Sequence, residues 1–240
     1  MGEIIVDFKN VYLSFSNKPV LKDVSFSIYK KDIFTIAGPS GIGKSTILKL
    51  ITGLLIPDKG EITVNADTFG MAFQQGALFN SMTVWENIAL ALIETTQLDI
   101  TQIDKRVKEA LETVNLTNAE KLYPDELSGG MQKRVGIARA LALKPSLLLY
   151  DEPSTGLDPS SAAKLEDDMI KLKSEINVTS IVVTHDVNTI KKVSDRIIIL
   201  DKCAIAWQGT KQEFMNDNSP YPLSFRERVS LNNNGENNGN

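Results

Sequence analysis

A glycine-rich stretch that ends in a lysine and two hydroxyls is the part of this sequence best suited to chemistry. Residues 38–46 read Gly-Pro-Ser-Gly-Ile-Gly-Lys-Ser-Thr, which fits the pattern G-x-x-x-x-G-K-[ST], and they follow the apolar run 33–37. Glycines let successive backbone N–H groups converge on an anion, and a helix starting at Lys44 would add its positive end. The stretch predicts a loop that binds a polyphosphate.

The lysine and the first hydroxyl of this loop are placed to act on the phosphates. Lys44 can reach the β- and γ-phosphates, and the Ser45 hydroxyl can ligate the Mg²⁺ ion that neutralises them. An ordinary glycine-rich turn needs neither group at these offsets, so nucleotide binding is the favoured interpretation. The loop residues assigned to the nucleotide are Gly38, Pro39, Ser40, Gly41, Ile42, Gly43, Lys44, Ser45 and Thr46, the last of which continues the helix.

Polar side chains also follow two other apolar runs. Asp151 and Glu152 come after residues 147–150, and His185, the only histidine, comes after residues 180–184. Ligands of open α/β sheets bind at the carboxyl ends of the strands. We expect Asp151 to hold Mg²⁺, Glu152 to polarise water and His185 to donate to a γ-phosphate. A pair of acids after a strand is weak evidence by itself, and a lone histidine is usually structural. The phosphate loop at the same edge of the sheet favours a functional interpretation of both.

A second surface suited to an anion begins at Ser128. Its hydroxyl and the free N–H groups of Gly129 and Gly130 lie at the start of a helix expected to run to about residue 143. The chain already has a complete loop for its own nucleotide. We therefore expect this surface to close over the nucleotide of another subunit, the alternative being a helix start without a ligand.

Two aromatic residues near the start of the chain are candidates for an adenine contact. Phe15, or else Tyr12, lies where a ring could stack on the base, a contact worth about 1–3 kcal/mol by analogy with other aromatic platforms. For Tyr12, packing in the core is an open alternative.

Hydrophobic periodicity divides the chain into strand-rich and helix-rich parts. Residues 3–15 and 24–29 alternate as antiparallel strands do, with a turn at 16–19. After short strands at 60–64 and 70–73, a helical subdomain is expected over about residues 76–142. Capping signals predict helix starts at Thr83, Thr101 and Thr117, and later at Asp158 before Pro159. We expect one domain over residues 1–231, followed by a disordered Asn- and Gly-rich tail at 232–240.

Composition limits the possible partners and surroundings. The net charge of -4 and a pI of about 5.2 leave no polybasic footprint, which argues against nucleic acid as the main partner. The single cysteine, Cys203, excludes an internal disulfide and is expected to be buried in a strand. No signal peptide is visible, and no apolar run approaches the roughly 20 residues of a membrane helix. Membrane association is therefore expected to come through a partner.

The motifs described above, taken in their order along the chain, resemble those of the ATPase subunit of ABC transporters over nearly the whole chain. The resemblance adds Gln74 as the residue of a Q-loop, residues 127–130 as the signature and residues 156–158 as a D-loop. It implies a P-loop α/β fold with a mainly parallel core sheet, an antiparallel β subdomain and a helical subdomain. It also implies ATP and Mg²⁺ as ligands, with a catalytic and metal-binding role for Gln74. Phe15 matches the family's adenine-stacking aromatic.

The same resemblance implies partners. Two chains would form a head-to-tail homodimer with two ATPs between phosphate loops and signatures, and the helical subdomains would grip integral-membrane permease subunits. Residues 38–44, 73–79 and 126–131, with Met131 in the signature, are similar to ATPases of Mla-type, MCE-linked phospholipid transporters. That implies an MCE-type lipid-binding protein in the complex and a place at the cytoplasmic face of the inner cell membrane. The segment from residue 60 to residue 74 is shorter than the corresponding segment usual in the family.

Three other functions compete with phospholipid transport. The chain could energise a transporter for another substrate. A soluble ABC protein of DNA repair or translation would need no permease, but such proteins usually carry a long coiled-coil insertion or two ATPase halves, which this sequence lacks. A binding-only pseudo-ATPase is disfavoured because Lys44, Asp151, Glu152 and His185 are all present.

Overall fold

A mainly parallel sheet forms the centre of the molecule. The computed structural model describes residues 2–73 and 76–235, and the side chains of the last helix as far as Glu227. The strands of this sheet lie in the order β5-β6-β7-β3-β8-β9, parallel except for the last pair. Their bounds are β3 Ile33–Ala37, β5 Phe69–Ala72, β6 Leu147–Asp151, β7 Thr179–Thr184, β8 Arg196–Asp201 and β9 Ala204–Thr210.

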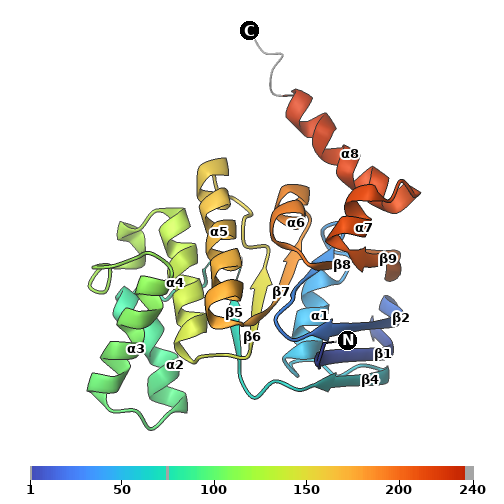
Figure 1. The fold of residues 1–240 in the computed structure, drawn as a ribbon. Helices are drawn as coiled ribbons and strands as arrows, with labels where there is room; N and C mark the ends of the chain where they lie inside the picture. The colour runs from blue at the N-terminus through green and yellow to red at the C-terminus, as the bar shows by residue number, and fades with distance from the viewer. Residues whose placement is uncertain (1, 74–75, 236–240) are drawn as a thin grey trace.

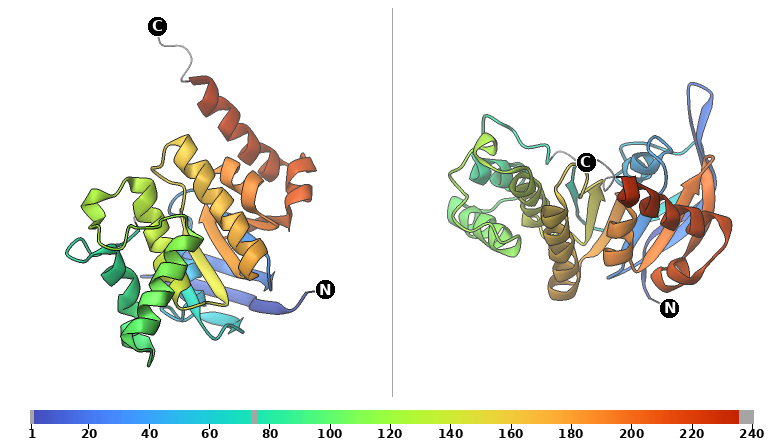
Figure 2. Two further views of the ribbon diagram at one scale, coloured as in Figure 1. Left: turned by 60° about the vertical axis from the view of Figure 1, so that its left-hand side comes forward. Right: turned by 90° about the horizontal axis from the view of Figure 1, so that it is seen from above.

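The two faces of the sheet are covered by different elements (Figures 1 and 2). In β6, Leu148 and Tyr150 pack with α5 (Pro159–Ile176) and the helical region, whereas Leu147 and Leu149 pack with α1 (Lys44–Ile51) and the N-terminal strands. A strand buried on both faces needs apolar side chains at successive positions, which explains the apolar runs of β3, β6 and β7. The two faces of β6 therefore belong to different apolar clusters.

A second, antiparallel sheet packs beside α1. It contains β1 (Ile4–Phe15), β2 (Lys18–Tyr29) and β4 (Lys59–Val64) in the order β2-β1-β4. The turn between β1 and β2 uses Ser16 and Asn17, both with positive φ, as tight hairpin turns require. Stacked Phe8, Phe26 and Phe34 rings join this sheet to β3 of the central sheet. Together with the parallel sheet, this confirms the predicted fold class.

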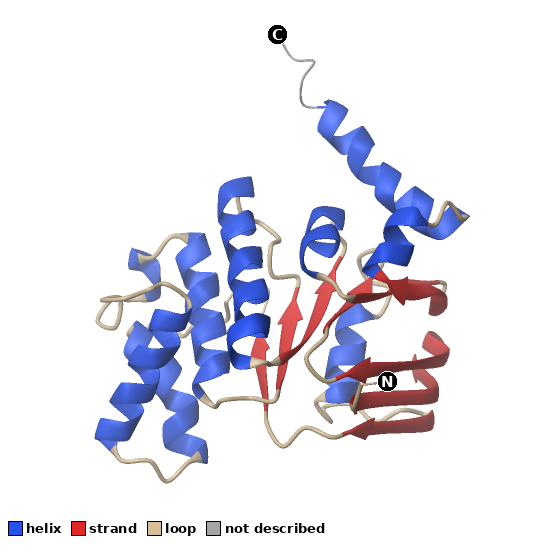
Figure 3. Ribbon diagram, in the orientation of Figure 1, coloured by secondary structure: helices blue, strands red, loops and turns tan. Residues whose placement is uncertain are grey.

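The helices between β5 and β6 lie at the side of the molecule away from the antiparallel sheet (Figure 3). Between β5 and β6 the chain forms α2 (Val84–Thr95), α3 (Ile100–Thr113), the short η1 (Pro124–Glu126) and α4 (Gly129–Ala142). The other helices are α6 (Val187–Val193), α7 (Lys211–Asn216) and α8 (Pro220–Gly235). Within the described ranges, no helix combines the length and the apolar character needed to cross a membrane.

Several local predictions need correction. Thr83 caps α2 as expected, but α3 is capped by Asp99 in place of Thr101, because Asp99 and Gln102 form a reciprocal capping box. The signal at Thr117 begins a turn and no helix. Cys203 lies in the β8–β9 turn with a φ of 69°, so it is outside the strands and only partly buried. Its thiol donates to the carbonyl oxygen of Pro19.

The predicted tail also differs in part. Helix α8 continues through residues 232–235, which the sequence predicts to be disordered, and it projects away from the sheets (Figure 1). Residues 236–240 lie outside the described part of the chain. The helix thus includes the first Asn residues of the tail, although Asn is only a moderate helix former.

A buried asparagine fixes the segment that leads into α2. Asn87 is fully buried, and its Oδ1 accepts a hydrogen bond from the backbone N–H of Phe79 at 2.8 Å. Its Nδ2 donates to the carbonyl oxygens of Phe79, Met82 and Thr83 at 2.9–3.1 Å. One side chain therefore satisfies several backbone groups of residues 79–83.

We expect Asn87→Ala to lower the free energy of unfolding by about 2–4 kcal/mol, because it leaves buried backbone groups without partners. Urea denaturation measures the change. Asn188→Ala, at an exposed position of α6, is the matched control and should stay within about 0.5 kcal/mol of the parent. Equal effects of the two substitutions would contradict the role given to Asn87.

Candidate nucleotide site

The glycine-rich loop lies between the end of β3 and the start of α1. Gly43 has a φ of 108°, and a Cβ there would lie 2.9 Å from the side chain of Val20. Gly38 also has positive φ, and a Cβ would lie 2.7 Å from the carbonyl oxygen of Leu200. At both positions a side chain is excluded by backbone conformation and by neighbouring atoms. The loop can therefore take its shape only with glycine at these two places.

The Lys44 side chain is held above its own loop. Its ammonium donates to the carbonyl oxygens of Gly38 at 2.9 Å and Pro39 at 3.1 Å, and it lies 3.3 Å from Glu152 Oε1. The side chain is only 5% exposed. A buried ammonium requires such partners, and each of them can be exchanged for a phosphate oxygen. The arrangement can present a cation to an anion bound in the loop.

Ser45 and Asp151 face each other across the gap between α1 and β6. The Ser45 hydroxyl donates to Asp151 Oδ1 at 3.0 Å. Burial is the main reason why the pKa of the Asp151 carboxyl is raised, and the Glu152 charge adds to it. The Ser45 hydrogen bond and the charges of Lys44 and Lys49 act in the opposite direction.

This donor set fits Mg²⁺. The ion prefers oxygen ligands and is usually held by one or two carboxylates, waters and substrate phosphates, so no closed protein cage is needed. The described residues contain no group of three or more His, Cys, Asp or Glu side chains that could hold a metal. Gln74, the other predicted metal ligand, lies outside the described residues and stays a prediction.

Glu152 and His185 form a pair at the ends of β6 and β7. His185 Nδ1 lies 2.9 Å from one carboxylate oxygen of Glu152 and 3.0 Å from the other. Glu152 has a φ of 50°, in the left-handed region that costs a residue with a side chain about 1–3 kcal/mol. Such strain is typical of functional sites because the surrounding structure must hold it in place.

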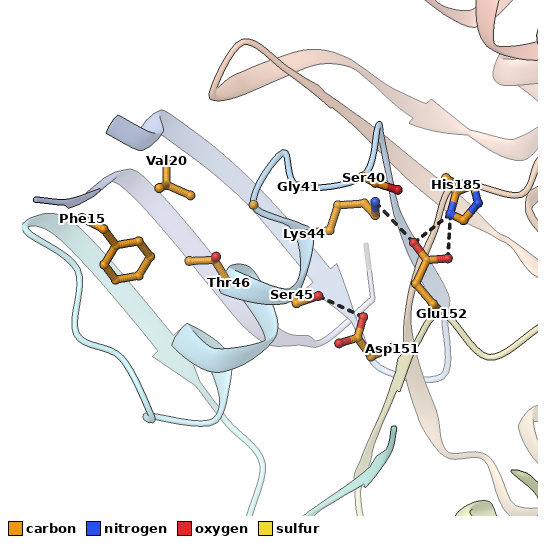
Figure 4. Close-up of a pocket in the computed structure, with 11 residues that line it drawn as sticks. Phe15, Val20, Ser40, Gly41, Lys44, Ser45, Thr46, Asp151, Glu152 and His185 are labelled. Carbon is orange, nitrogen blue, oxygen red and sulfur yellow. Dashed lines mark hydrogen bonds and ion pairs between the residues drawn. The ribbon is translucent and has the colours of Figure 1, made fainter. Parts of the chain in front are cut away.

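These residues line one cavity of about 390 Å³ (Figure 4). Glu152 and His185 lie at one end, Lys44 and Ser45 in the middle, and Phe15 at the other end. Phe15 is 46% exposed and lines the cavity, whereas Tyr12 is 37% exposed and is not part of its lining. The structure thus separates the two aromatic candidates, and Tyr12 does not pack in the core. The remaining lining residues are Val20, Ser40, Gly41, Gly43, Thr46 and Asp151.

Not every predicted site residue reaches this cavity. Ile42 packs against the core beside α1, and Gly38 and Pro39 contribute their carbonyls to Lys44. Residues 128–130 do not line the cavity. Ser128 caps α4, and its hydroxyl accepts a hydrogen bond from the backbone N–H of Met131 at 3.3 Å. One chain therefore does not bring its signature to its own phosphate loop.

Sequence reasoning missed two residues at this site. Val20 of β2 forms a cavity wall near Phe15, but an alternating strand contains many such apolar residues. Thr155 donates its hydroxyl to Glu152 Oε2 at 3.2 Å. The only signal for Thr155 in the sequence is its place three residues after Glu152, a candidate catalytic acid.

A strand, a glycine-rich loop and a helix with a buried lysine, next to paired acids at the same sheet edge, define a P-loop nucleotide-binding site. The ABC transporter family matches residues 21–155, which is more than half of the chain. The chain belongs to this family, and it is an ATPase of the ABC type.

Known proteins match the chain over most of its length. The chloroplastic protein TRIGALACTOSYLDIACYLGLYCEROL 3 of Arabidopsis thaliana is 37% identical over 93% of this chain and 74% of its own. The intermembrane phospholipid transport ATP-binding protein MlaF of Escherichia coli K12 is 36% identical over 94% and 90%. The sulfate/thiosulfate import ATP-binding protein CysA of Thermosynechococcus vestitus is 38% identical over 94% and 70%.

A solved structure agrees with these relatives. The ATP-binding cassette MJ0796, in a dimeric post-hydrolysis state bound to ADP and Pi, is 33% identical with a TM-score of 0.74. The match covers 86% of this chain and 98% of that one. This cassette therefore shares both sequence and fold with the chain.

The raised pKa of Asp151 predicts a stability change with pH. A raised pKa means that the Asp151 carboxyl binds its proton more tightly in the folded protein than in the unfolded chain. The loss of this proton therefore destabilises the fold once the pH exceeds the ordinary pKa of 3.8. The penalty is complete above the raised, folded-state pKa. We expect Asp151→Asn to raise the melting temperature of the nucleotide-free protein near pH 7, with a gain that shrinks as the pH falls toward 3.8.

Thermal unfolding in EDTA at a series of pH values measures this gain. Asp67→Asn, at an exposed position, is the matched control and should show no comparable gain. A melting temperature for Asp151→Asn below that of the parent at pH 7 would contradict the assignment of burial as the dominant cause.

Proposed function

We propose that this chain is the ATP-hydrolysing subunit of a membrane transporter that moves phospholipid together with an MCE-type lipid-binding protein. The similarity to the intermembrane phospholipid transport protein over 94% of this chain supports the transporter role. A sulfate importer subunit has a similar identity, so overall identity does not select the cargo. The choice of phospholipid depends on residues 75–79 and on Met131, which lie in or near the part that would face a permease.

ATP would occupy the cavity from the phosphate loop to Phe15. Lys44 would exchange the carbonyls of Gly38 and Pro39 for β- and γ-phosphate oxygens, while the loop N–H groups bind the phosphates from the backbone side. Phe15, exposed at the far end of the cavity, would stack on the adenine ring.

Hydrolysis would take place at the opposite end. Ser45, Asp151 and Gln74 would hold Mg²⁺, which supplies positive charge against the phosphates when bound. Glu152 would accept a proton from water as the water oxygen attacks the γ-phosphorus and the bond to the ADP oxygen breaks. His185, paired with Glu152, would donate to the γ-phosphate.

The signature would act on a second chain. Ser128, Gly129 and Gly130 start α4 away from the chain's own cavity, and nothing lies within 4 Å of a Cβ placed on Gly129. We propose a head-to-tail homodimer in which these residues close over the partner's ATP. The dimeric state of the cassette bound to ADP and Pi supports this arrangement.

An apolar surface that includes Phe73 and Phe79 would contact the permease. Both side chains are more than two-fifths exposed. Through this contact the chain would lie at the cytoplasmic face of the inner cell membrane. ATP-driven closure would move the helical subdomain, and Gln74 with residues 76–82 would relay that motion.

The role of Glu152 predicts a trapped state. Glu152→Gln keeps the size of the side chain but removes the basic carboxylate, so hydrolysis should fall by about 100-fold or more, as loss of a general base typically causes. ATP binding should persist and hold the dimer closed, which sedimentation with Mg-ATP would detect. A monomeric variant, or hydrolysis at the parent rate, would show that Glu152 is not the base.

The choice of cargo predicts the partners. Affinity purification from solubilised membranes should recover a multi-spanning permease together with a single-span protein that has a lipid-binding domain, with phospholipid bound. A permease accompanied by a sugar- or peptide-binding protein would overturn the lipid proposal and leave the ATPase assignment intact. Purification without any permease would favour a soluble ABC protein.

A further inference from the structure

Lys133 joins α4 to the loop that follows β6. Its ammonium donates to the carbonyl oxygens of Pro153 at 2.7 Å and Thr155 at 2.5 Å. Burial lowers the pKa of Lys133, and the charge of Glu152 acts in the opposite direction. A partly buried ammonium needs hydrogen-bond acceptors, so this contact is costly to break. The loop is thereby fixed to the helix that begins with the signature.

The loop held by Lys133 in turn contacts the Glu152 carboxylate. The Thr155 hydroxyl donates to Glu152 Oε2 at 3.2 Å, and the Thr155 N–H donates to the Glu152 carbonyl at 3.3 Å. Glu152 has a strained backbone, which persists only where neighbouring contacts maintain it. The hydrogen bond from Lys133 to the Thr155 carbonyl is the contact by which α4 helps to maintain this conformation of Glu152.

We propose that Lys133 is a positioning residue for ATP hydrolysis, which keeps the Glu152 carboxylate beside Lys44 and His185 by fixing residues 153–155 to α4. The inference rests on the proposed role of Glu152. Ser128 caps the helix that contains Lys133. A shift of the start of α4 would therefore move residues 153–155, and with them the Glu152 carboxylate. A second chain's nucleotide bound at the signature would therefore affect the geometry of this chain's own base.

The test separates catalysis from nucleotide binding. Lys133→Met removes the donors at nearly constant length, and the single-turnover rate of ATP hydrolysis by the full chain should fall about 10- to 100-fold, since small misplacements of a catalytic group cost that much. Affinity for a fluorescent ATP analogue should stay within about twofold, because the phosphate loop is untouched. Lys133→Arg, which keeps charge-assisted donors, should recover most of the rate.

The matched control is Lys105→Met, at a side chain that is 79% exposed on α3, and it should leave the rate and the affinity unchanged. If Lys133→Met does not fold, Thr155→Val, which removes only the hydroxyl bonded to Glu152, should show the same loss of rate without loss of affinity. A parental rate in the folded variant, or a parallel loss of rate and affinity, would overturn the inference. Glu152→Gln is measured in the same experiment to distinguish the positioning role of Lys133 from the role of Glu152 as the base. A parental rate for Glu152→Gln would refute the role of Glu152 itself.

Discussion

The site depends on the pairing of two nearly buried charges, the Lys44 ammonium and the Glu152 carboxylate, which lie 3.3 Å apart. An unpaired charge in the interior is costly, so each of these groups needs partners there. The pair joins the loop after β3 to the end of β6. His185 and the Thr155 hydroxyl also contact Glu152, and the carbonyls of Gly38 and Pro39 also contact Lys44. A bound phosphate would enter this network by replacing existing acceptors.

The parallel sheet brings these groups together from distant parts of the chain. β7 pairs with both β3 and β6, and the register aligns Ala37 with Thr184 and Asp151 with Val183. The strands therefore end at one edge, and the residues that follow them share one cavity. The helical region is inserted between β5 and β6, so the chain can carry a signature on α4 without disturbing the order of the central strands.

Much of this fold and site could be predicted from the sequence because the signals are local. The apolar runs mark strands buried on both faces, Asp158 before Pro159 marks a helix start, and the loop pattern marks the phosphate site. The cap at Asp99 also has a local signal, the Asp99–Gln102 capping box, which begins two residues before the predicted cap at Thr101. Tertiary contacts decided other features, because the contact of Lys133 with a loop about twenty residues away leaves no trace in periodicity. Gln74 and the roles of the site residues remain predictions.

The claim that two chains build each ATP site is tested most directly by mixing two variants, each also carrying Glu152→Gln to prevent turnover. Ser128→Arg blocks the signature, and Lys44→Ala weakens the phosphate loop. In a mixed dimer, one composite site has both faces intact. Sedimentation with Mg-ATP should therefore show dimers in the mixture that neither variant forms alone. Dimers of Ser128→Arg alone, or none in the mixture while the Glu152→Gln parent dimerises, would contradict the account.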